Sequence, residues 1–423
     1  MKRRLSIEQA SVLLFALCWL MYSFSYIARL NYAAALAGMV LDGVFTKTQA
    51  GLIGSVALFT YGAGQLINGI LGDRLSPYRM VTMGLALSAL SNLTMGFLRS
   101  YPAMAAVWGV NGFAQSMLWT PVLFLFSRVL PEEYRYKSCI HINTCTPAGT
   151  VMAYAFSLLV LQRHSWNGVF FMGAAALAFA GVVWVFSTGL VRKTLPIQPA
   201  IAKPETNGPP HGASENGADR PPRSLGGLLL SSGLLMLLFP VAISGMLKDG
   251  VVTWVPTMLT EAYTVPASFS LLLTILLPVV NLAGTYASSF VYKRFTKDEI
   301  KTAALFYAIT LLPLFGLLGI GRISIYTSVL LLAVITTAVH AANSMTITLA
   351  PVRFGAYGKS AAVGGILNAT VYLGSAVSTG VFGFLADAFG WGPTVCSWLI
   401  CTVLAVVLCI PSFLQWRQFS RAQ

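Results

Sequence analysis

The sequence predicts an all-α membrane protein in which twelve transmembrane helices form two pseudo-symmetric six-helix bundles. Three observations support this prediction: the composition, the spacing of the apolar stretches and the distribution of positive charge. Of the 423 residues, 56% are hydrophobic and only 9% are charged. Soluble domains carry about 25% charged residues, so this chain cannot cover a water-facing surface. We therefore expect its surroundings to be a lipid bilayer.

The apolar stretches are long enough to cross that bilayer. A spanning helix needs about 20 mostly apolar residues. Twelve stretches meet this requirement, and they lie near residues 11–38, 48–71, 79–98, 102–128, 138–161, 167–190, 226–259, 267–292, 300–319, 325–350, 360–385 and 393–414.

The positive charges fix the expected orientation. The chain has 27 Lys and Arg and a net charge of +14. With the N-terminus inside, 21 of these cations fall in cytoplasmic segments, 4 fall in outer loops, and Arg29 and Lys248 fall within spans. This asymmetry follows the positive-inside rule. It predicts a multi-pass protein of the plasma membrane (the inner membrane if the cell is bacterial) with both termini cytoplasmic. No basic helix is interleaved with aromatic residues, so we expect no nucleic-acid binding.

A polar segment divides the chain. Residues 203–223 are rich in Pro, Gly and polar residues, and such a composition cannot bury enough apolar surface to become ordered. We therefore interpret residues 191–224 as a flexible cytoplasmic linker. It separates an N-terminal six-helix bundle, residues 1–190, from a C-terminal one, residues 225–423.

The two halves share a pattern of polar residues. Arg29 stands 13 residues before an aspartate, and Lys248 stands 13 residues before a glutamate. Asn143 and Asn368 are each followed, six residues later, by a glycine. Such repeats are typical of a duplicated six-helix unit, which places the substrate site at the interface of its halves near the middle of the membrane.

Arg29 and Lys248 are the strongest candidates for a functional site. A charge near the bilayer centre costs about 2.5 kcal/mol or more, so it normally faces a cavity or a partner. Two alternatives stay open: each side chain extends to the membrane surface, or Lys248 forms an ion pair with Asp249. Two cations facing one cavity would attract a small anion, with Arg29 as a planar fork for phosphate or carboxylate and Lys248 as a point charge.

Other polar residues in the spans are candidates for lining that cavity. Tyr22, Tyr26 and Arg29 share one helix face because they are spaced by four and three. Each such residue alone is also explained by hydrogen bonding between helices, and His340 by a structural hydrogen bond. The predicted substrate-binding set is Arg29, Lys248, Tyr22, Tyr26, Tyr61, Gln65, Trp119, Asn143, Thr146, His340, Asn368 and Tyr372.

Several function classes lack their sequence pattern. Asp249 is the only carboxylate well inside a span, so a carboxylate proton relay is disfavoured and exchange of anions is favoured. No GxxxxGK[ST] motif occurs, which argues against ATP-driven transport. No nucleophile–base set and no metal-type spacing of Cys or His occurs in the spans. We expect no enzyme activity, no cofactor and no metal.

In several short motifs the sequence resembles the major facilitator superfamily. Residues 69–79, GILGDRLSPYR, are similar to the family's cytoplasmic loop motif, although Ser76 and Pro77 replace the usual Gly-Arg. We expect Asp73 and Arg74 in this loop to act in gating, by holding the cytoplasmic side of the protein closed. Four further segments resemble the organophosphate:phosphate antiporters, the glycerol-3-phosphate and hexose-phosphate transporters: 26–31 (YIARLN), 112–121 (GFAQSMLWTP), 248–256 (KDGVVTWVP) and 372–374 (YLG).

The resemblance implies a fold, a mechanism and a substrate. In that family two cations hold the phosphate group, and rocking of the halves exchanges it for inorganic phosphate. Arg29 and Lys248 match those cations. Gln65 and Thr146 stand where bacterial members carry a Lys and a His, which makes a less highly charged anion more credible.

The predicted function is therefore secondary transport of a small organic anion, a phosphorylated metabolite exchanged for inorganic phosphate by alternating access. The alternative is a proton- or sodium-coupled symporter of a carboxylate or a sugar acid. A further alternative is a membrane sensor that binds without transporting. A monomer in the lipid bilayer, with the anion as partner, is expected to suffice.

Overall fold

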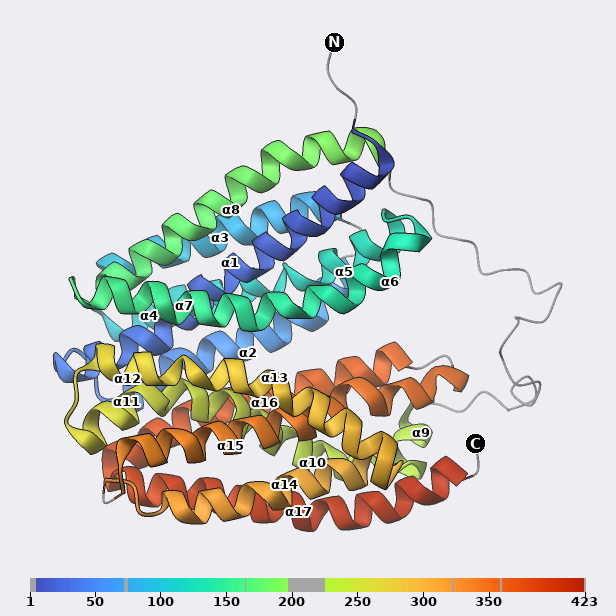
Figure 1. Cartoon of the computed structure of the whole chain (residues 1–423). Coiled ribbons are helices and arrows are strands. Elements are labelled where there is room, and N and C mark those ends of the chain that lie inside the picture. Colours follow the sequence, from blue (N-terminus) through green and yellow to red (C-terminus); the bar gives the residue numbers. More distant parts are fainter. Residues whose placement is uncertain are drawn as a thin grey trace.

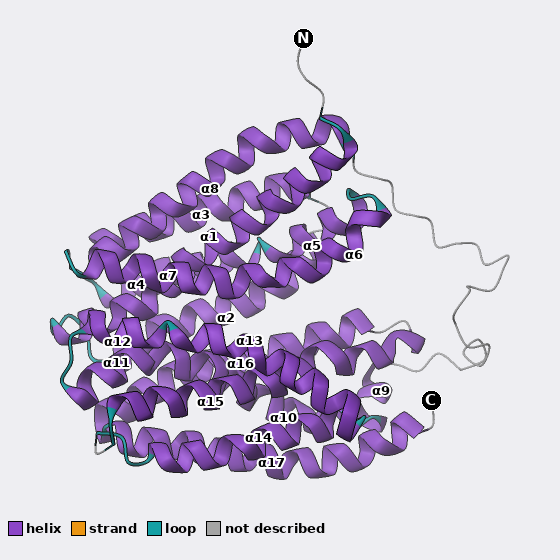
Figure 2. Ribbon diagram, viewed as in Figure 1, coloured by secondary structure: helices purple, strands orange, loops and turns teal. Residues whose placement is uncertain are grey.

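The structure is a computed structural model that describes residues 5–71, 75–163, 165–196, 225–321, 323–357 and 360–421. Within these ranges every regular element is a helix (Figure 2). The all-α prediction is thus confirmed. Long apolar helices form because a backbone in lipid has to satisfy its own hydrogen bonds.

The first part of the chain forms eight α-helices and one 3₁₀ helix (Figure 1). They are α1 (Ile7–Leu41), α2 (Lys47–Leu71), α3 (Pro77–Phe97), α4 (Tyr101–Ser116), α5 (Trp119–Arg128), α6 (Glu132–His141), η1 (Ile142–Thr144), α7 (Cys145–Leu161) and α8 (Asn167–Thr194).

The second part contains nine α-helices, with π-helical turns at η3, η4 and η5 and a 3₁₀ helix at η6. In chain order these elements are α9 (Leu225–Ser231), α10 (Leu234–Gly245), η3 (Met246–Gly250), α11 (Val251–Tyr263), α12 (Ala267–Thr274), α13 (Leu276–Val291), η4 (Tyr292–Thr296), α14 (Glu299–Leu317), α15 (Ile325–Ser344), η5 (Met345–Leu349), η6 (Ala350–Tyr357), α16 (Ser360–Phe389) and α17 (Trp391–Arg421).

The helices account for the twelve predicted spans. Within the described ranges, ten continuous helical segments are long and apolar enough to cross a membrane. The remaining two predicted spans are interrupted: 102–128 is divided into α4 and α5, and 138–161 into α6, η1 and α7. The predicted span 226–259 also differs, because α9 is a separate short helix and the spanning segment runs over Leu234–Tyr263.

Prolines explain the interruptions. A proline lacks the N–H that would bond the carbonyl four residues earlier, and its ring clashes with that carbonyl. Pro121 lies four residues after Met117, which separates α4 from α5. Pro147 is the third residue of α7 and lies four residues after a residue of η1, the 3₁₀ segment that separates α6 from α7. The local sequence therefore sets each break.

Figure 1 shows α1–α8 together in its upper part and α9–α17 in its lower part. In the upper group α1 packs on α7 and α8, and α2 packs on α4. In the lower group α14 packs on α15 and α17, and α10 packs on α16 and α17. The predicted boundaries 1–190, 191–224 and 225–423 stay a prediction, and residues 197–224 of the linker lie outside the described ranges.

A buried polar network joins α1, α3 and α4. The Asn31 amide donates to Asn92 Oδ1 at 2.8 Å. Ser88 donates to Asn111 Oδ1 at 2.5 Å, and Gln115 donates to Ser88 Oγ at 2.9 Å. All five side chains are buried. Such networks hold helices together where lipid supplies no hydrophobic force between them.

The two groups of helices meet most extensively along a seam between α2 and α16. Glycines allow the two backbones to come close: a Cβ on Gly51 would lie 2.6 Å from the Thr379 carbonyl oxygen, and one on Gly383 would lie 2.5 Å from the Lys47 carbonyl oxygen. These distances are too short for any side chain. The seam therefore depends on the absence of side chains at both glycines.

Polar contacts cross between the groups at the far end, by which we mean the helix ends near residues 41–48, 259–267 and 387–391 (left in Figure 1). Lys47 forms an ion pair with Glu261, with Nζ 3.0 Å from Oε2. The Trp391 indole N–H donates to the same Glu261 oxygen at 2.8 Å. Thr48 Oγ1 donates to Asp387 Oδ2 at 2.8 Å. The far end is thus closed by charged hydrogen bonds.

Candidate functional site

Arg29 lies in the middle of α1, within a group of tyrosine rings. Its guanidinium carbon is 4.1 Å from the ring centroid of Tyr61, 5.6 Å from that of Tyr26 and 5.7 Å from that of Tyr372. Cations within about 6 Å of an aromatic face are attracted by the ring quadrupole. Tyr61 belongs to α2 and Tyr372 to α16. Arg29 therefore stands where helices of both groups meet.

The aromatic cluster continues along α1 away from the far end. Tyr22 contacts Tyr26, with ring centroids 5.6 Å apart, and contacts Trp119 of α5 at 4.8 Å. Tyr61 and Tyr372 contact each other at 4.7 Å. Tilted and edge-on contacts of this kind add about 0.5–1.5 kcal/mol each to apolar burial. They hold the rings around Arg29 in place.

Lys248 approaches the same cluster from the other group of helices. It lies in the π-helical turn η3, and its Nζ is 5.7 Å from the Tyr372 ring centroid. Arg29 is also 5.7 Å from that centroid. The two intramembrane cations predicted from the sequence thus lie beside one ring. This placement does not match the alternative in which both side chains extend to the membrane surface.

Lys248 is paired with the adjacent carboxylate. Its Nζ is 3.0 Å from Asp249 Oδ1, and the Ser375 hydroxyl donates to Asp249 Oδ2 at 2.7 Å. The side chains of Lys248 and Asp249 are 16% and 23% exposed. The ion-pair alternative from the sequence is therefore correct in part. Arg29, by contrast, forms no ion pair with a carboxylate in the described part of the chain.

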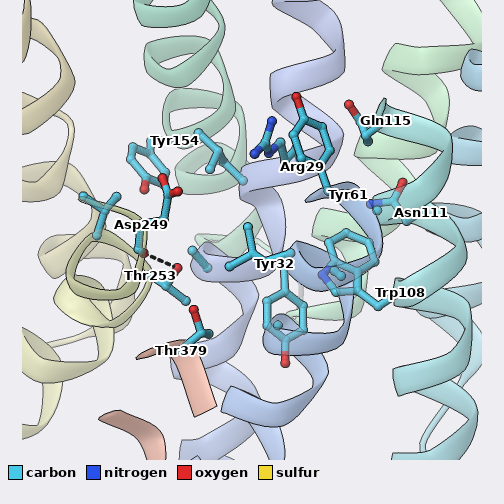
Figure 3. Close-up of a pocket in the computed structure, with 17 residues that line it drawn as sticks. Arg29, Tyr32, Tyr61, Trp108, Asn111, Gln115, Tyr154, Asp249, Thr253 and Thr379 are labelled. Atoms are coloured by element: carbon cyan, nitrogen blue, oxygen red, sulfur yellow. Dashed lines mark hydrogen bonds between the residues drawn. The ribbon is translucent and has the colours of Figure 1, made fainter. Parts of the chain in front are cut away.

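A cavity of about 90 Å³ lies beside these groups (Figure 3). A water molecule needs about 10–15 Å³ of such space, so the cavity holds several waters or a small polar group. Arg29 and Tyr61 line it, and so does Asp249. The carboxylate paired with Lys248 thus faces the same space as the unpaired cation.

Several lining residues were absent from the predicted set. They are Tyr32, Trp108, Asn111, Gln115, Tyr154, Asp249, Thr253 and Thr379. Tyr154 is the most informative of them, because its side chain is fully buried and its hydroxyl has no hydrogen-bond partner among the described residues. Buried polar atoms without a partner are rare. The only sequence signal for it is a tyrosine inside the apolar stretch that became α7.

The remaining predicted residues divide by their surroundings. Gln65 donates to the Tyr61 hydroxyl at 2.8 Å and so supports the cluster. His340 lies close enough to Lys248 and Asp249 to interact with their charges. Thr146 and Asn368 are half-buried. Among the predicted residues whose side chains the structure describes, Arg29 and Tyr61 line the cavity, whereas Lys248 and the others do not. Asp73 and Arg74 lie outside the described residues, as does the side chain of Asn143.

Comparison with known proteins identifies the class. The family model of the major facilitator superfamily matches residues 18–378. The chain belongs to this superfamily, and it is a multi-pass membrane transporter rather than an enzyme. A crystal structure of the nucleoside transporter NupG has the same fold, with a TM-score of 0.70 and 16% identity over 96% of this chain and 99% of that one.

Several curated relatives are named for phosphorylated compounds, and one is named as a membrane sensor. The glycerol-3-phosphate transporter of Bacillus subtilis (strain 168) is 25% identical over 95% of this chain and 91% of its own length. The probable hexose phosphate transport protein of Chlamydia muridarum is 25% identical, but the alignment covers 47% of this chain and 43% of that protein. A shorter match, 31% over 97 residues, is the membrane sensor protein UhpC of Salmonella typhimurium, and it covers 23% of this chain and 22% of that protein. These findings confirm the resemblance to the organophosphate:phosphate antiporters.

Proposed function

We infer that this transporter carries a small phosphorylated metabolite across the plasma membrane in exchange for inorganic phosphate. The observation on which this depends is the meeting of Arg29 and Lys248, one from each group of helices, at the ring of Tyr372. The full-length similarity to a glycerol-3-phosphate transporter supports the same substrate class. Arg29 supplies the planar fork that binds phosphate oxygens in pairs.

Alternating access is the proposed mechanism. The bundles 1–190 and 225–423 rock about the site, with residues 191–224 as the connection between them. The far-end ion pair of Lys47 and Glu261 and the α2–α16 seam close one side in this conformation. With both termini cytoplasmic, that closed side faces outwards. One chain contains both cations, so we propose that a monomer is the working unit.

Phosphate counterflow in proteoliposomes tests the proposal. We expect uptake of labelled phosphate into vesicles loaded with phosphate, and its loss by at least ten-fold in Arg29→Ala and in Lys248→Ala. Arg417→Ala is the matched control, because Arg417 is an exposed cation near the end of α17. Unchanged counterflow in Arg29→Ala would contradict the assigned site. Absence of anion uptake by the wild-type protein across a metabolite panel would reject the function.

A second candidate is a symporter of a carboxylate or a sugar acid, coupled to protons or sodium. The Lys248–Asp249 ion pair favours it, because the pair reduces the positive charge available to a phosphate group. Uptake that depends on pH or Na⁺ without any counter-anion would support this candidate. The partial similarity to UhpC keeps a sensor as a third candidate, which binding without flux would identify.

A further inference from the structure

Asp249 is a carboxylate inside a site proposed to bind anions. It adjoins Lys248 in η3, where the wider π-helical turn replaces the regular α-helix. In a regular helix adjacent side chains do not face each other. Here the two charged groups meet at 3.0 Å, and Asp249 also lines the cavity that contains Arg29.

The carboxylate is held on both of its oxygens. Oδ1 faces Lys248, and Oδ2 accepts the Ser375 hydroxyl at 2.7 Å. The Ser375 side chain is fully buried and also contacts the Val371 and Gly245 carbonyls. A carboxylate with two fixed partners is a permanent component of the site rather than a side chain that happens to lie nearby.

This carboxylate changes the charge of the site. Arg29 and Lys248 carry one positive charge each, and Asp249 carries one negative charge. An ordinary histidine has a pKa of about 6.5 and is neutral at pH 8, so His340 is not counted among the fixed charges of the site. The site therefore presents one net positive charge, not two. Charges buried away from water are stable only when they are compensated.

We propose that Asp249 is a built-in counter-anion that makes the transporter select singly charged over doubly charged anions. The inference rests on the proposed function, because it assumes that the anion binds at these cations. A singly charged anion makes the occupied site neutral, whereas a doubly charged one leaves an excess negative charge. The selected class comprises phosphodiesters, singly protonated phosphate monoesters and carboxylates, including sugar acids.

Two probes of nearly equal shape separate charge from size. Methyl sulfate carries one negative charge. Methyl phosphate carries two at pH 8, since the second pKa of a phosphate monoester is about 6. Binding of each is measured on the purified full-length protein at pH 8. For the wild-type protein we expect methyl sulfate to bind more tightly than methyl phosphate. The ratio of these two affinities tests the inference on the wild-type protein alone, without any variant.

Asp249→Asn removes the charge with little change in shape. Across about 4 Å, one charge changes affinity by about five-fold per charge on the ligand at the dielectric constant of water, and by about a thousand-fold at an effective value of about 20. For a cavity that holds water we take a value near the lower limit, about ten-fold. We therefore expect about ten-fold tighter binding of methyl sulfate and about a hundred-fold tighter binding of methyl phosphate, so the ratio of the two affinities shifts by about ten-fold towards methyl phosphate. Asp249→Glu keeps the charge and is expected to keep the wild-type preference.

Asp298→Asn is the matched control. Asp298 caps α14 by accepting the Lys301 backbone N–H at 2.8 Å, and asparagine caps equally well. This variant is expected to leave the ratio unchanged. An equal effect of Asp249→Asn on both probes, or a wild-type preference for methyl phosphate, would overturn the inference while leaving the anion site intact. A wild-type protein that binds neither probe and lacks phosphate counterflow would reject the proposed function itself.

Discussion

Lys47→Met is expected to weaken the closure of the far end. The ion pair with Glu261 has both carboxylate oxygens at hydrogen-bond distance, and the two side chains are 16% and 24% exposed. Fully exposed pairs contribute about 0.2–1 kcal/mol, and hydrogen bonds to charged groups about 1.5–3 kcal/mol. The partly buried pair falls between these ranges, so we take about 1.4 kcal/mol. That value shifts the ratio of open to closed far ends by about ten-fold.

The distance between spin labels at Asp42→Cys and Phe389→Cys reports this shift, in a background without the native cysteines. Both positions lie at the far end and are exposed, one on each group of helices. We expect Lys47→Met and Glu261→Gln each to increase the population with the longer distance.

A double-mutant cycle isolates the pair. The combined variant should show less than the sum of the single shifts, with a coupling of about 1.4 kcal/mol. Exposed Lys301 at the start of α14 provides the control, Lys301→Met, which should leave the distances unchanged. Distance distributions identical to the wild type in both single variants, or strictly additive shifts, would refute the assignment of the ion pair to closure.

Three further outcomes concern stability, each read from the melting temperature of the purified protein. Gly374→Ala should lower the melting temperature, because a Cβ there would lie 2.0 Å from the Ala242 carbonyl oxygen, and overpacking costs about 1–3 kcal/mol. In the control Gly365→Ala, in the same helix, the added Cβ meets nothing within 4 Å and should have little effect. Equal shifts of the melting temperature in the two variants would contradict this packing. Asn92→Ala should cost about 1–3 kcal/mol because it leaves buried partners unsatisfied, whereas an unchanged melting temperature would mean that the network contributes little. Glu299→Ala should also lower the melting temperature, since this buried carboxylate accepts hydrogen bonds from three side chains. Glu299→Gln should lower it less, and a larger decrease in Glu299→Gln than in Glu299→Ala would argue against charged hydrogen bonds at this position.

The sequence was sufficient to predict the helical architecture and part of the group of residues that the structure brings together around Arg29. Charges are rare in spans because they are costly, so Arg29 and Lys248 stood out without any coordinates. Tyr61 and Tyr372 were members of the predicted substrate-binding set. The structure places both rings beside Arg29.

The other residues of the site could not be predicted, because their roles depend on contacts between helices that a local sequence pattern does not reveal. Thr253 and Thr379 resemble any hydroxyl that bonds within its own helix, and only the packing of α11 and α16 brings them to the cavity. The unsatisfied hydroxyl of Tyr154 likewise results from what surrounds it. The partner of Lys248 was foreseen as an alternative, but its second contact, Ser375, lies 126 residues further along the chain than Asp249.

The α2–α16 seam has a mechanical consequence. Interlocking side chains would have to change rotamers before two helices could separate, whereas surfaces of backbone and glycine slide or part as rigid bodies. At Gly51 and Gly383 the nearest atoms of the partner helix are backbone carbonyl oxygens, whereas Tyr61 and Tyr372 pack ring against ring elsewhere in the same seam. Shear motions are small sliding movements of packed helices, and these two glycines carry no side chain that would obstruct such a movement. Gly51 and Gly383 are therefore expected to let α2 and α16 shift against each other at these points, while the nearby ion pair of Lys47 and Glu261 stabilises the closed arrangement.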